Sequence, residues 1–255
     1  MEQPWSIFFS TSDYLRTFSD ALAVWCFTHH HRDYLLQRLS LPEERVQVVP
    51  IFTRTLSLPS IPTIQSKEYR ERAEQAGWAL QELDFIVTGS HSERRAEIGN
   101  QLHAWSQQNS LISEIIFGKW TQLPFGEERH LSLALTKVVL NIHADERSSL
   151  EVHRINHLLS LSKCIISERS VVDSHTDSLY AGAVIFADNT THLHHLAGYY
   201  IQNETARLEV EKSAYQMFKL IQENTTMMAR SMEYVHHQLR SIMHKTRVYV
   251  NTIVM

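Results

Sequence analysis

A series of short apolar runs, separated by stretches with helical character, constrains the fold more than any other feature of the sequence. The runs are apolar throughout rather than alternating, which is typical of strands that are covered on both faces of a parallel sheet. We expect strands at residues 21–27, 46–52, 84–88, 111–117, 137–143, 163–167 and 183–186. Strands that alternate with helices indicate βαβ units. The sequence therefore predicts an α/β fold with a doubly wound parallel sheet.

The stretches between these runs have the signals of helices. Thr28 is expected to cap the first helix, and Ser148 or Ser149 a later one, because hydroxyl side chains accept hydrogen bonds from free N–H groups at helix starts. Gly89-Ser90 is expected to form a turn after the strand at 84–88. Helices are predicted at residues 28–39, 92–107, 127–135, 148–161, 190–200, 204–222 and 225–243.

The pattern divides the chain into four parts. Residues 1–52 hold two strands and one helix, which is only a partial N-terminal α/β segment. Residues 53–64 include Pro59 and Pro62 and have little periodicity, so they are expected to be a linker. Residues 65–222 contain five strands and form a complete α/β domain. Residues 223–255 are expected to be a C-terminal helical tail.

Composition excludes several classes of protein. Hydrophobic residues make up 43% of the chain and the net charge is -4, which favours a globular protein and no nucleic-acid partner. The longest apolar runs, 21–27 and 179–187, are too short for an integral membrane span. Cys26 and Cys164 lie in apolar runs and are expected to be buried, reduced thiols. With an N-terminus that lacks a basic region, this predicts a cytoplasmic protein.

Glycine and histidine usage also limits the chemistry. Only 7 of the 255 residues are glycine, and no Gly-rich phosphate-binding or nucleophile motif is present. The 16 histidines include clusters at 29–31, 192–195 and 236–237. Neighbouring histidines on a helix point about 100° apart, so these clusters are expected to be polar helix faces. We predict no metal site and no cofactor.

Polar side chains follow three of the predicted strands at the ends where open parallel sheets bind ligands. Taken singly, each residue has a structural alternative as a solvated or capping side chain, but their convergence favours a site. The candidates for substrate binding are Gly89, Ser90, Arg94, Arg95, Glu151, Arg154 and Glu168, and the candidate catalytic residue is His143.

Each candidate has a chemical reason. Helix N-termini at these strand ends present free N–H groups and a positive dipole, which suit a phosphate or diphosphate. Arg94 or Arg95 could bind the same group in a bidentate manner. Glu168 could accept hydrogen bonds from ribose hydroxyls. His143 would place a polar group near the reacting centre.

At these residues the chain resembles the GT-B glycosyltransferases, over roughly residues 13–220. The segment from Ser19–Phe27 to Glu44–Ile51 looks like the end of their N-terminal domain, and Asp84–Ser90 with Glu93-Arg94-Arg95 looks like the opening of their donor-binding domain. The chain also resembles the nucleotide-sugar region of one branch of this family. The matching segments are Lys137–His143, Leu150–Arg154 and Cys164–Glu168, followed by Asp177–Tyr180, Val184–Phe186, Tyr215 and Phe218.

The resemblance implies a Rossmann-like domain that binds a nucleotide-diphosphate sugar as donor substrate. By this resemblance Gly89 and Ser90 lie near the phosphates, Glu151 and Arg154 open the helix that faces the donor, and Glu168 lies near the sugar or ribose. The implied activity is a hexosyltransferase that transfers the sugar to an unknown acceptor.

The chain departs from the family in its N-terminal part, where only the last third of an acceptor domain has a counterpart. The family's N-terminal glycine-rich turn and catalytic base have no visible equivalent. One hypothesis is therefore a glycosyltransferase, either compact or a truncated form of a longer two-domain enzyme. A partner chain or a homo-oligomer could supply the missing half. The alternative is a catalytically inactive nucleotide- or sugar-binding or protein-interaction module that kept the fold.

Overall fold

The computed structural model describes residues 20–21, 23–26, 28–48, 58, 60–118, 126–223 and 232–241. The chain divides into two units, which are described separately. One consists of Met1–Ile51 together with Ile221–Met255, and the other is Phe52–Leu220. Part of the predicted linker is helical: α4 spans Ile61–Gln65 and is capped by Ser60.

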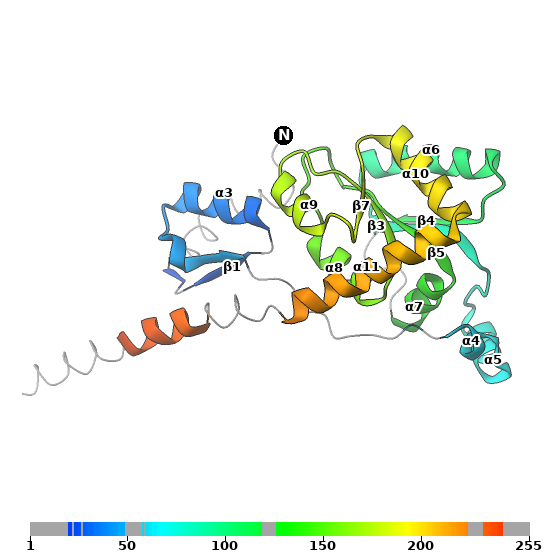
Figure 1. Ribbon diagram of the computed structural model, residues 1–255, viewed down its shortest axis with the longest axis horizontal. Helices are drawn as coiled ribbons and strands as arrows, with labels where there is room; N and C mark the ends of the chain where they lie inside the picture. Colours follow the sequence, from blue (N-terminus) through cyan, green and yellow to red (C-terminus); the bar gives the residue numbers. More distant parts are fainter. Residues whose placement is uncertain are drawn as a thin grey trace, which may run out of the picture. The chain divides into compact units, whose positions relative to one another are not determined.

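The larger unit is built on a sheet of five parallel strands (Figure 1). Their order across the sheet is β4-β3-β5-β6-β7, and every neighbouring pair is parallel. The strands are β3 (Leu83–Ser90), β4 (Ser113–Gly118), β5 (Thr136–Asn141), β6 (Cys164–Glu168) and β7 (Ile185–Ala187). The five-stranded parallel sheet predicted for this part of the chain is confirmed.

Helices cover both faces of this sheet. α6 and α10 contact each other on one face, while α7 contacts β3 and β5 from the other, as Figure 1 shows. The helices of the unit that follow α4 are α5 (Lys67–Ala76), α6 (Glu93–Gln108), α7 (Gly126–Ala134), α8 (Val152–Ser160), α9 (Ser174–Tyr180), α10 (Thr190–Gln202) and α11 (Glu204–Glu223). The predicted doubly wound α/β arrangement is therefore confirmed.

The main core lies between the sheet and the α6–α10 face. Strand side chains such as Phe85 and Leu140 are fully buried against Leu102 of α6 and Leu193 of α10. α6 approaches the edge strand closely at Gly99, where a Cβ atom would come within 3.0 Å of the Phe117 ring. This packing explains why the strands are apolar on both faces, since each face is covered by a helix layer.

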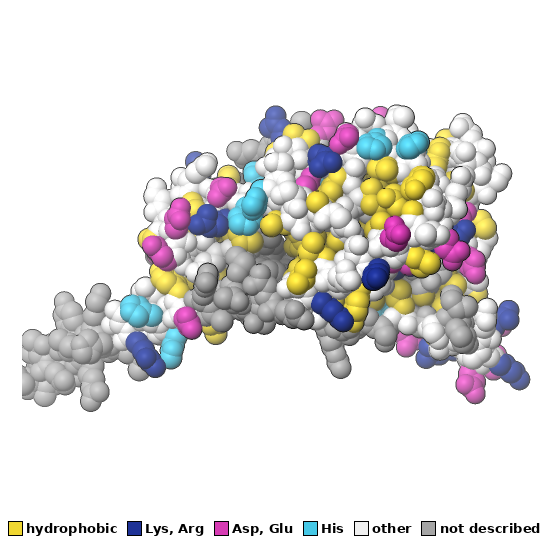
Figure 2. Space-filling view, in the orientation of Figure 1, with side chains coloured by type: hydrophobic (Ala, Val, Ile, Leu, Met, Phe, Trp, Pro, Cys, Tyr) yellow, Lys and Arg dark blue, Asp and Glu magenta, His cyan; other side chains and the backbone are white. Residues whose placement is uncertain are grey.

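Large apolar side chains remain exposed on the outer helices. Tyr199 of α10 and Leu208, Tyr215 and Leu220 of α11 are all partly open to solvent. In Figure 2, apolar atoms gather over these two helices, among charges of both signs.

Two local predictions are corrected at the strand ends. Gly89 and Ser90 do not form a turn but are the last residues of β3, paired with Phe117 and Gly118 of β4. The pairing with β4 extends the strand beyond its apolar run, and only long-range contacts reveal such a partner.

The start of α8 is also corrected. It begins at Val152 after the N-cap position Glu151, not at Ser148 or Ser149, and no side chain caps it. The Ser148 hydroxyl instead accepts a hydrogen bond from the backbone N–H of Asp145 at 3.4 Å. Ser148 thus stabilises a turn in the loop, which is the usual competitor of helix capping for serine.

Two further helices are absent from the sequence predictions. α5 is capped by Ser66 and ends at Gly77, whose φ of 73° is left-handed. Its sequence is polar with one buried side chain, Ala73, so it has little apolar periodicity. α9 is short and is capped by Asp173, which accepts a hydrogen bond from Thr176 N–H.

The other unit contains a smaller α/β element. β1 (Val24–Cys26) and β2 (Val46–Val48) pair in parallel, joined by α3 (His29–Leu39) and a 3-10 turn at Glu43–Arg45. Thr28 caps α3, as predicted, by accepting a hydrogen bond from His31 N–H at 3.2 Å. Ala21 and Ala23 of the first predicted strand are described but lie outside β1, and residues 22, 27 and 49–52 of the two predicted strands lie outside the described residues.

Residues 232–241 of the predicted tail helix are helical, while its remaining residues are not described. Cys26 and Cys164 are both free and buried, as predicted, and burial raises the pKa of each thiol to about 12. Among the helices in the described ranges, none is both long and apolar enough to cross a bilayer.

Candidate functional site

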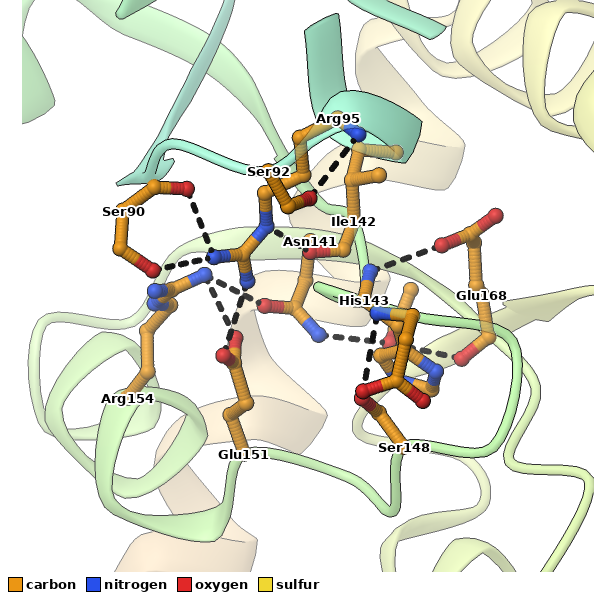
Figure 3. Close-up of polar contacts among 12 residues, drawn as sticks. Ser90, Ser92, Arg95, Asn141, Ile142, His143, Ser148, Glu151, Arg154 and Glu168 are labelled. Atoms are coloured by element: carbon orange, nitrogen blue, oxygen red, sulfur yellow. Dashed lines mark hydrogen bonds and ion pairs between the residues drawn. The ribbon is translucent and has the colours of Figure 1, made fainter. Parts of the chain in front are cut away.

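The strand order places a topological switch point between β3 and β5. From this point the chain winds outward to β4 on one side and to β6 and β7 on the other. Ligands of open α/β sheets bind beyond the carboxyl ends of the strands at such a point. Residues at and directly after the carboxyl ends of β3, β5 and β6 form two polar networks there, which share the end of β5 (Figure 3).

Arg95 is the centre of the first network and is fully buried, with 0% of its surface exposed. Its Nε donates to the Ile142 carbonyl at 2.9 Å, and Nη1 donates to both the carbonyl and the hydroxyl of Ser90. Nη2 donates to Glu151 Oε1 at 2.8 Å. One guanidinium thereby joins the end of β3, the end of β5 and the start of α8.

Gly89 makes room for this guanidinium. A Cβ atom at Gly89 would come within 3.0 Å of both Cζ and Nη1 of Arg95. Gly89 and Ser90 therefore lie against Arg95 in this structure. The phosphate contacts that the resemblance implies for them, and the direct phosphate clamp suggested for Arg95, stay predictions.

Glu151 and Arg154 extend the network along α8. Arg154 Nη1 lies 2.6 Å from Glu151 Oε2 and donates to Asn141 Oδ1 at 3.0 Å. Asn141 in turn donates to the Ser167 hydroxyl at the end of β6. Burial raises the pKa of Glu151, but the positive charges of Arg154 and Arg95 outweigh it and hold that pKa below its usual value. Glu151 is therefore ionised at neutral pH.

The second network joins Arg94, His143 and Glu168. Arg94 forms a bidentate pair with Glu168, with N–O distances of 2.8 and 2.5 Å. Arg94 Nη1 also donates to the His143 carbonyl at 3.0 Å. Glu168 Oε2 accepts a hydrogen bond from the His143 backbone N–H at 2.7 Å. The loop after β5 is thus held by both partners of the ion pair.

The His143 side chain is buried, with 2% of the residue exposed, and its Nε2 atom has no hydrogen-bond partner among the described residues. Burial lowers the pKa of His143, although Glu168, Glu151 and Asp177 oppose the shift. The ring is therefore neutral at pH 7. A neutral imidazole can accept or donate one hydrogen bond at Nε2, depending on its tautomer.

A cavity of about 300 Å³ lies beyond the carboxyl ends of β5, β6 and β7. Arg94, His143 and Glu168 line it, together with acidic side chains of the loop after β5, Asp145 and Glu146. The remaining wall comes from the loop after β6, with Arg169 and Val171, from Ala187 at the end of β7, and from the start of α10, with Asp188, Asn189 and Thr190. Arg169 Nε pairs with Asp188 at 2.9 Å.

The structure thus separates the eight candidate residues into two groups. Arg94, His143 and Glu168 line the cavity, whereas the other five belong to the network around Arg95. The sequence predictions placed a helix at 190–200, where α10 lies, but did not include the start of this helix in the site. The signal was available in Asn189, which follows a strand and caps α10 by accepting a hydrogen bond from His192 N–H.

Metal ligands are not grouped in the described part of the chain. No set of three or more His, Cys, Asp or Glu side chains there is arranged to hold a metal ion.

No family model matches the chain, and no curated protein matches it. Several solved structures match the chain. A mutant of S. aureus TarM, in complex with fondaparinux, alpha-GlcNAc-glycerol and UDP, matches with a TM-score of 0.59 at 9% identity, over 88% of this chain and 45% of TarM. Sucrose-phosphate synthase from Thermosynechococcus elongatus matches with a TM-score of 0.56 at 11% identity, over 89% of this chain and 61% of the synthase.

HepE from Anabaena, in complex with UDP-glucose, matches with a TM-score of 0.54 at 10% identity, over 92% of this chain and 69% of HepE. The chain therefore has the GT-B fold of glycosyltransferases, and the resemblance seen in the sequence is confirmed for the fold. It spans about half the length of the TarM structures that it matches, at 45%.

Proposed function

We propose that this chain is a glycosyltransferase, or the donor-binding part of one, that takes a nucleotide-diphosphate sugar in the cavity beyond β5, β6 and β7. The observation that carries the proposal is His143, a buried histidine with an unpaired Nε2 in the wall of a charged cavity on a GT-B fold. A buried polar atom without a partner costs free energy unless a ligand or water satisfies it. A sugar hydroxyl is a suitable partner.

The reaction transfers the sugar between two oxygens. The bond from the anomeric carbon to the diphosphate oxygen breaks, a bond from that carbon to an acceptor oxygen forms, and the proton of the acceptor hydroxyl passes to the departing diphosphate or to water. The nucleoside diphosphate that leaves carries the developing negative charge. Arg94 and the free N–H groups at the start of α10 would stabilise this charge electrostatically.

The other residues would bind and position the donor. Glu168 would accept hydrogen bonds from hydroxyls of the sugar or ribose, and His143 would contact the sugar near the reacting carbon. Arg95, Glu151 and Arg154 would hold the ends of β3 and β5 in place. TarM and HepE are recorded with UDP and UDP-glucose, so uridine nucleotides are the first ligands to test.

Calorimetric titration and thermal shift of the full chain test the proposal, with UDP, GDP, their sugars and a non-nucleotide control. A ligand at about 100 times its Kd should add roughly 2.7 kcal/mol of stability. His143→Gln and Arg94→Gln should weaken binding. His91→Gln, at an exposed position outside the cavity wall, should not. Should no nucleotide bind, or should neither cavity variant change the Kd, the proposed site is wrong.

One observation supports a second candidate, a binding module without catalysis. Both arginines that line the cavity are paired with carboxylates, Arg94 with Glu168 and Arg169 with Asp188. Such pairing lowers the positive potential that a departing diphosphate requires. Release of UDP from a UDP-sugar in the presence of acceptors separates the two candidates: a binding module would hold the nucleotide and release nothing.

A further inference from the structure

The Arg94 and Glu168 side chains are already hydrogen-bonded to each other. Both would contact the donor in the proposed function, yet they form a bidentate pair with each other across the cavity wall. Bidentate arginine–carboxylate pairs are among the stronger hydrogen-bonded contacts in proteins. In this arrangement neither charge is fully available to a ligand.

The two partners are held differently. The Glu168 side chain is 9% exposed and also accepts the His143 backbone N–H, so it is the inner, fixed partner. The Arg94 side chain is 26% exposed and reaches in from the first turn of α6. Arg94 also keeps a separate contact with the His143 carbonyl. Each partner therefore retains one protein contact when the bonds between them break.

The charge around the pair makes simple addition of an anion unfavourable. Besides Glu168, the cavity wall carries Asp145, Glu146 and Asp188, and only two arginines. Asp145 and Glu146 lie close enough to Arg94 to help raise its pKa, after the larger effect of Glu168. A phosphate entering this cavity meets more negative than positive charge, so it needs direct contact with a guanidinium group, and both arginines of the wall are paired with carboxylates.

We infer that the donor binds by exchange: its phosphate oxygens replace Glu168 on Arg94, and the freed Glu168 carboxylate accepts hydrogen bonds from hydroxyls of the same molecule. The inference rests on the proposed function and defines how that site selects its ligand. A molecule that carries both an anionic phosphate and a polyol satisfies both partners. Phosphate alone leaves the inner carboxylate without its arginine.

Inorganic pyrophosphate is the probe that tests this exchange, in calorimetric titrations of the full chain. Glu168→Gln keeps an oxygen for the His143 N–H but removes the charge that holds Arg94. Charge-assisted hydrogen bonds contribute enough that pyrophosphate should bind at least roughly tenfold more tightly to this variant. The gain should disappear in the double variant R94Q/E168Q, since the arginine that receives the phosphate is missing.

Glu146→Gln is the matched control, because it removes the same charge from the same cavity without breaking the pair. Its effect should stay below about fivefold, as for a general change in local charge. Equal gains in E146Q and E168Q would overturn the exchange. An E168Q variant without a gain would also overturn it, and if the wild type still bound UDP, the proposed function would stand.

Arg94→Gln gives a test that does not depend on the folding of E168Q. The exchange requires this single variant to bind pyrophosphate more weakly than the wild type, and an unchanged Kd would overturn it. If neither pyrophosphate nor UDP bound to the wild type or to any folded variant, the exchange and the proposed function would both fail.

Discussion

At the scale of single residues, Arg95 stands out because a fully buried arginine needs a partner for each polar atom. Its guanidinium makes four hydrogen bonds to Ile142, Ser90 and Glu151. From the sequence alone Arg94 and Arg95 are equivalent candidates for a phosphate. The fold distinguishes them, since Arg94 lines the cavity and Arg95 joins the strand ends behind it.

Arg95→Met should destabilise the protein strongly. The substitution fills similar space but removes a buried partner of Glu151 and leaves two carbonyls without their donors, which should cost about 3–5 kcal/mol in the free energy of unfolding. Urea unfolding followed by circular dichroism measures the loss. Arg70→Ala, at an exposed position on α5, should change stability by less than about 0.5 kcal/mol. A loss below about 1 kcal/mol for R95M would contradict the role of Arg95.

Gly89→Ala should also destabilise, because its new methyl group would come within 3.0 Å of the Arg95 guanidinium. Displacing a buried, fully bonded group should cost about 1–3 kcal/mol. Gly198→Ala in α10 is a control that should stabilise the protein. Its Cβ would meet the nearest atom, on the Trp105 ring, at an ordinary 3.7 Å, and alanine favours the helix by up to about 1 kcal/mol. Thermal melts of both variants compare the two effects.

At the scale of elements, the start of α6 determines where both arginines lie. Ser92 caps this helix by accepting a hydrogen bond from the Arg95 backbone N–H at 3.1 Å. The same turn therefore carries the cap, the cavity arginine and the buried arginine. A weaker cap should affect both stability and the site.

Ser92→Ala should lower the free energy of unfolding by about 1 kcal/mol and weaken nucleotide binding, while Ser92→Asp should retain both, since aspartate also caps helices. Ser66→Ala removes the equivalent cap of α5, which carries none of the candidate site residues. It should cost similar stability but leave nucleotide affinity unchanged. Equal loss of affinity in S66A and S92A would point to general destabilisation instead.

α7 and α8 meet through two stacked histidines, His130 and His157, whose ring centroids lie 6.0 Å apart. Burial, with the positive charge of Arg129 and the neighbouring His130, lowers the pKa of His157 from 6.5 to about 4. Between these values the unfolded chain binds a proton that the folded chain does not. The stability that the neutral His157 side chain contributes is therefore complete above about pH 6.5 and is lost as the pH falls towards 4.

His157→Gln should make the free energy of unfolding less dependent on pH in this range. Urea unfolding at intervals from about pH 4.5 to 7.5 gives the slope of the unfolding free energy against pH, which is positive where the unfolded state binds more protons. The slope should be smaller in H157Q than in the wild type. His195→Gln, at an exposed position on α10, should leave it unchanged. An unaltered slope in H157Q would show that the half-buried His130–His157 pair does not control acid stability.

At the scale of the whole molecule, all eight candidate residues and the entire cavity wall belong to the unit Phe52–Leu220. Its sheet, both helix layers and its core are complete within that range. Side chains of α11 also contribute to it, because Ala214 and Phe218 are buried. Folding and donor binding should therefore be properties of this unit.

A fragment of residues 52–223 should unfold cooperatively and bind the nucleotide found for the full chain with a Kd within about threefold. A fragment that ends at residue 203 lacks α11 and should fold poorly, because Phe218 is missing from the core. Circular dichroism melts and calorimetry compare the two fragments with the full chain. Loss of binding in a well-folded longer fragment would mean that residues outside the unit complete the site.

By itself, the sequence determined the layer architecture of this protein. Continuous apolar runs, helix periodicity and the cap Thr28 are local signals, and each is set by interactions within a few residues. They were enough to predict the five parallel strands and the polar residues at their carboxyl ends. The same local rules failed at Ser148, where a turn within the loop competed with a helix cap.

Only the tertiary structure decided the strand order and the partners of the charged residues. The contacts that distinguish the two arginines join Arg94 to Glu168, 74 residues away, and Arg95 to Ile142, 47 residues away. Local patterns carry no information on such pairs, because they form only when the sheet brings distant strand ends to one edge. For the same reason the start of α10 became part of the cavity only once β7 was placed beside β6.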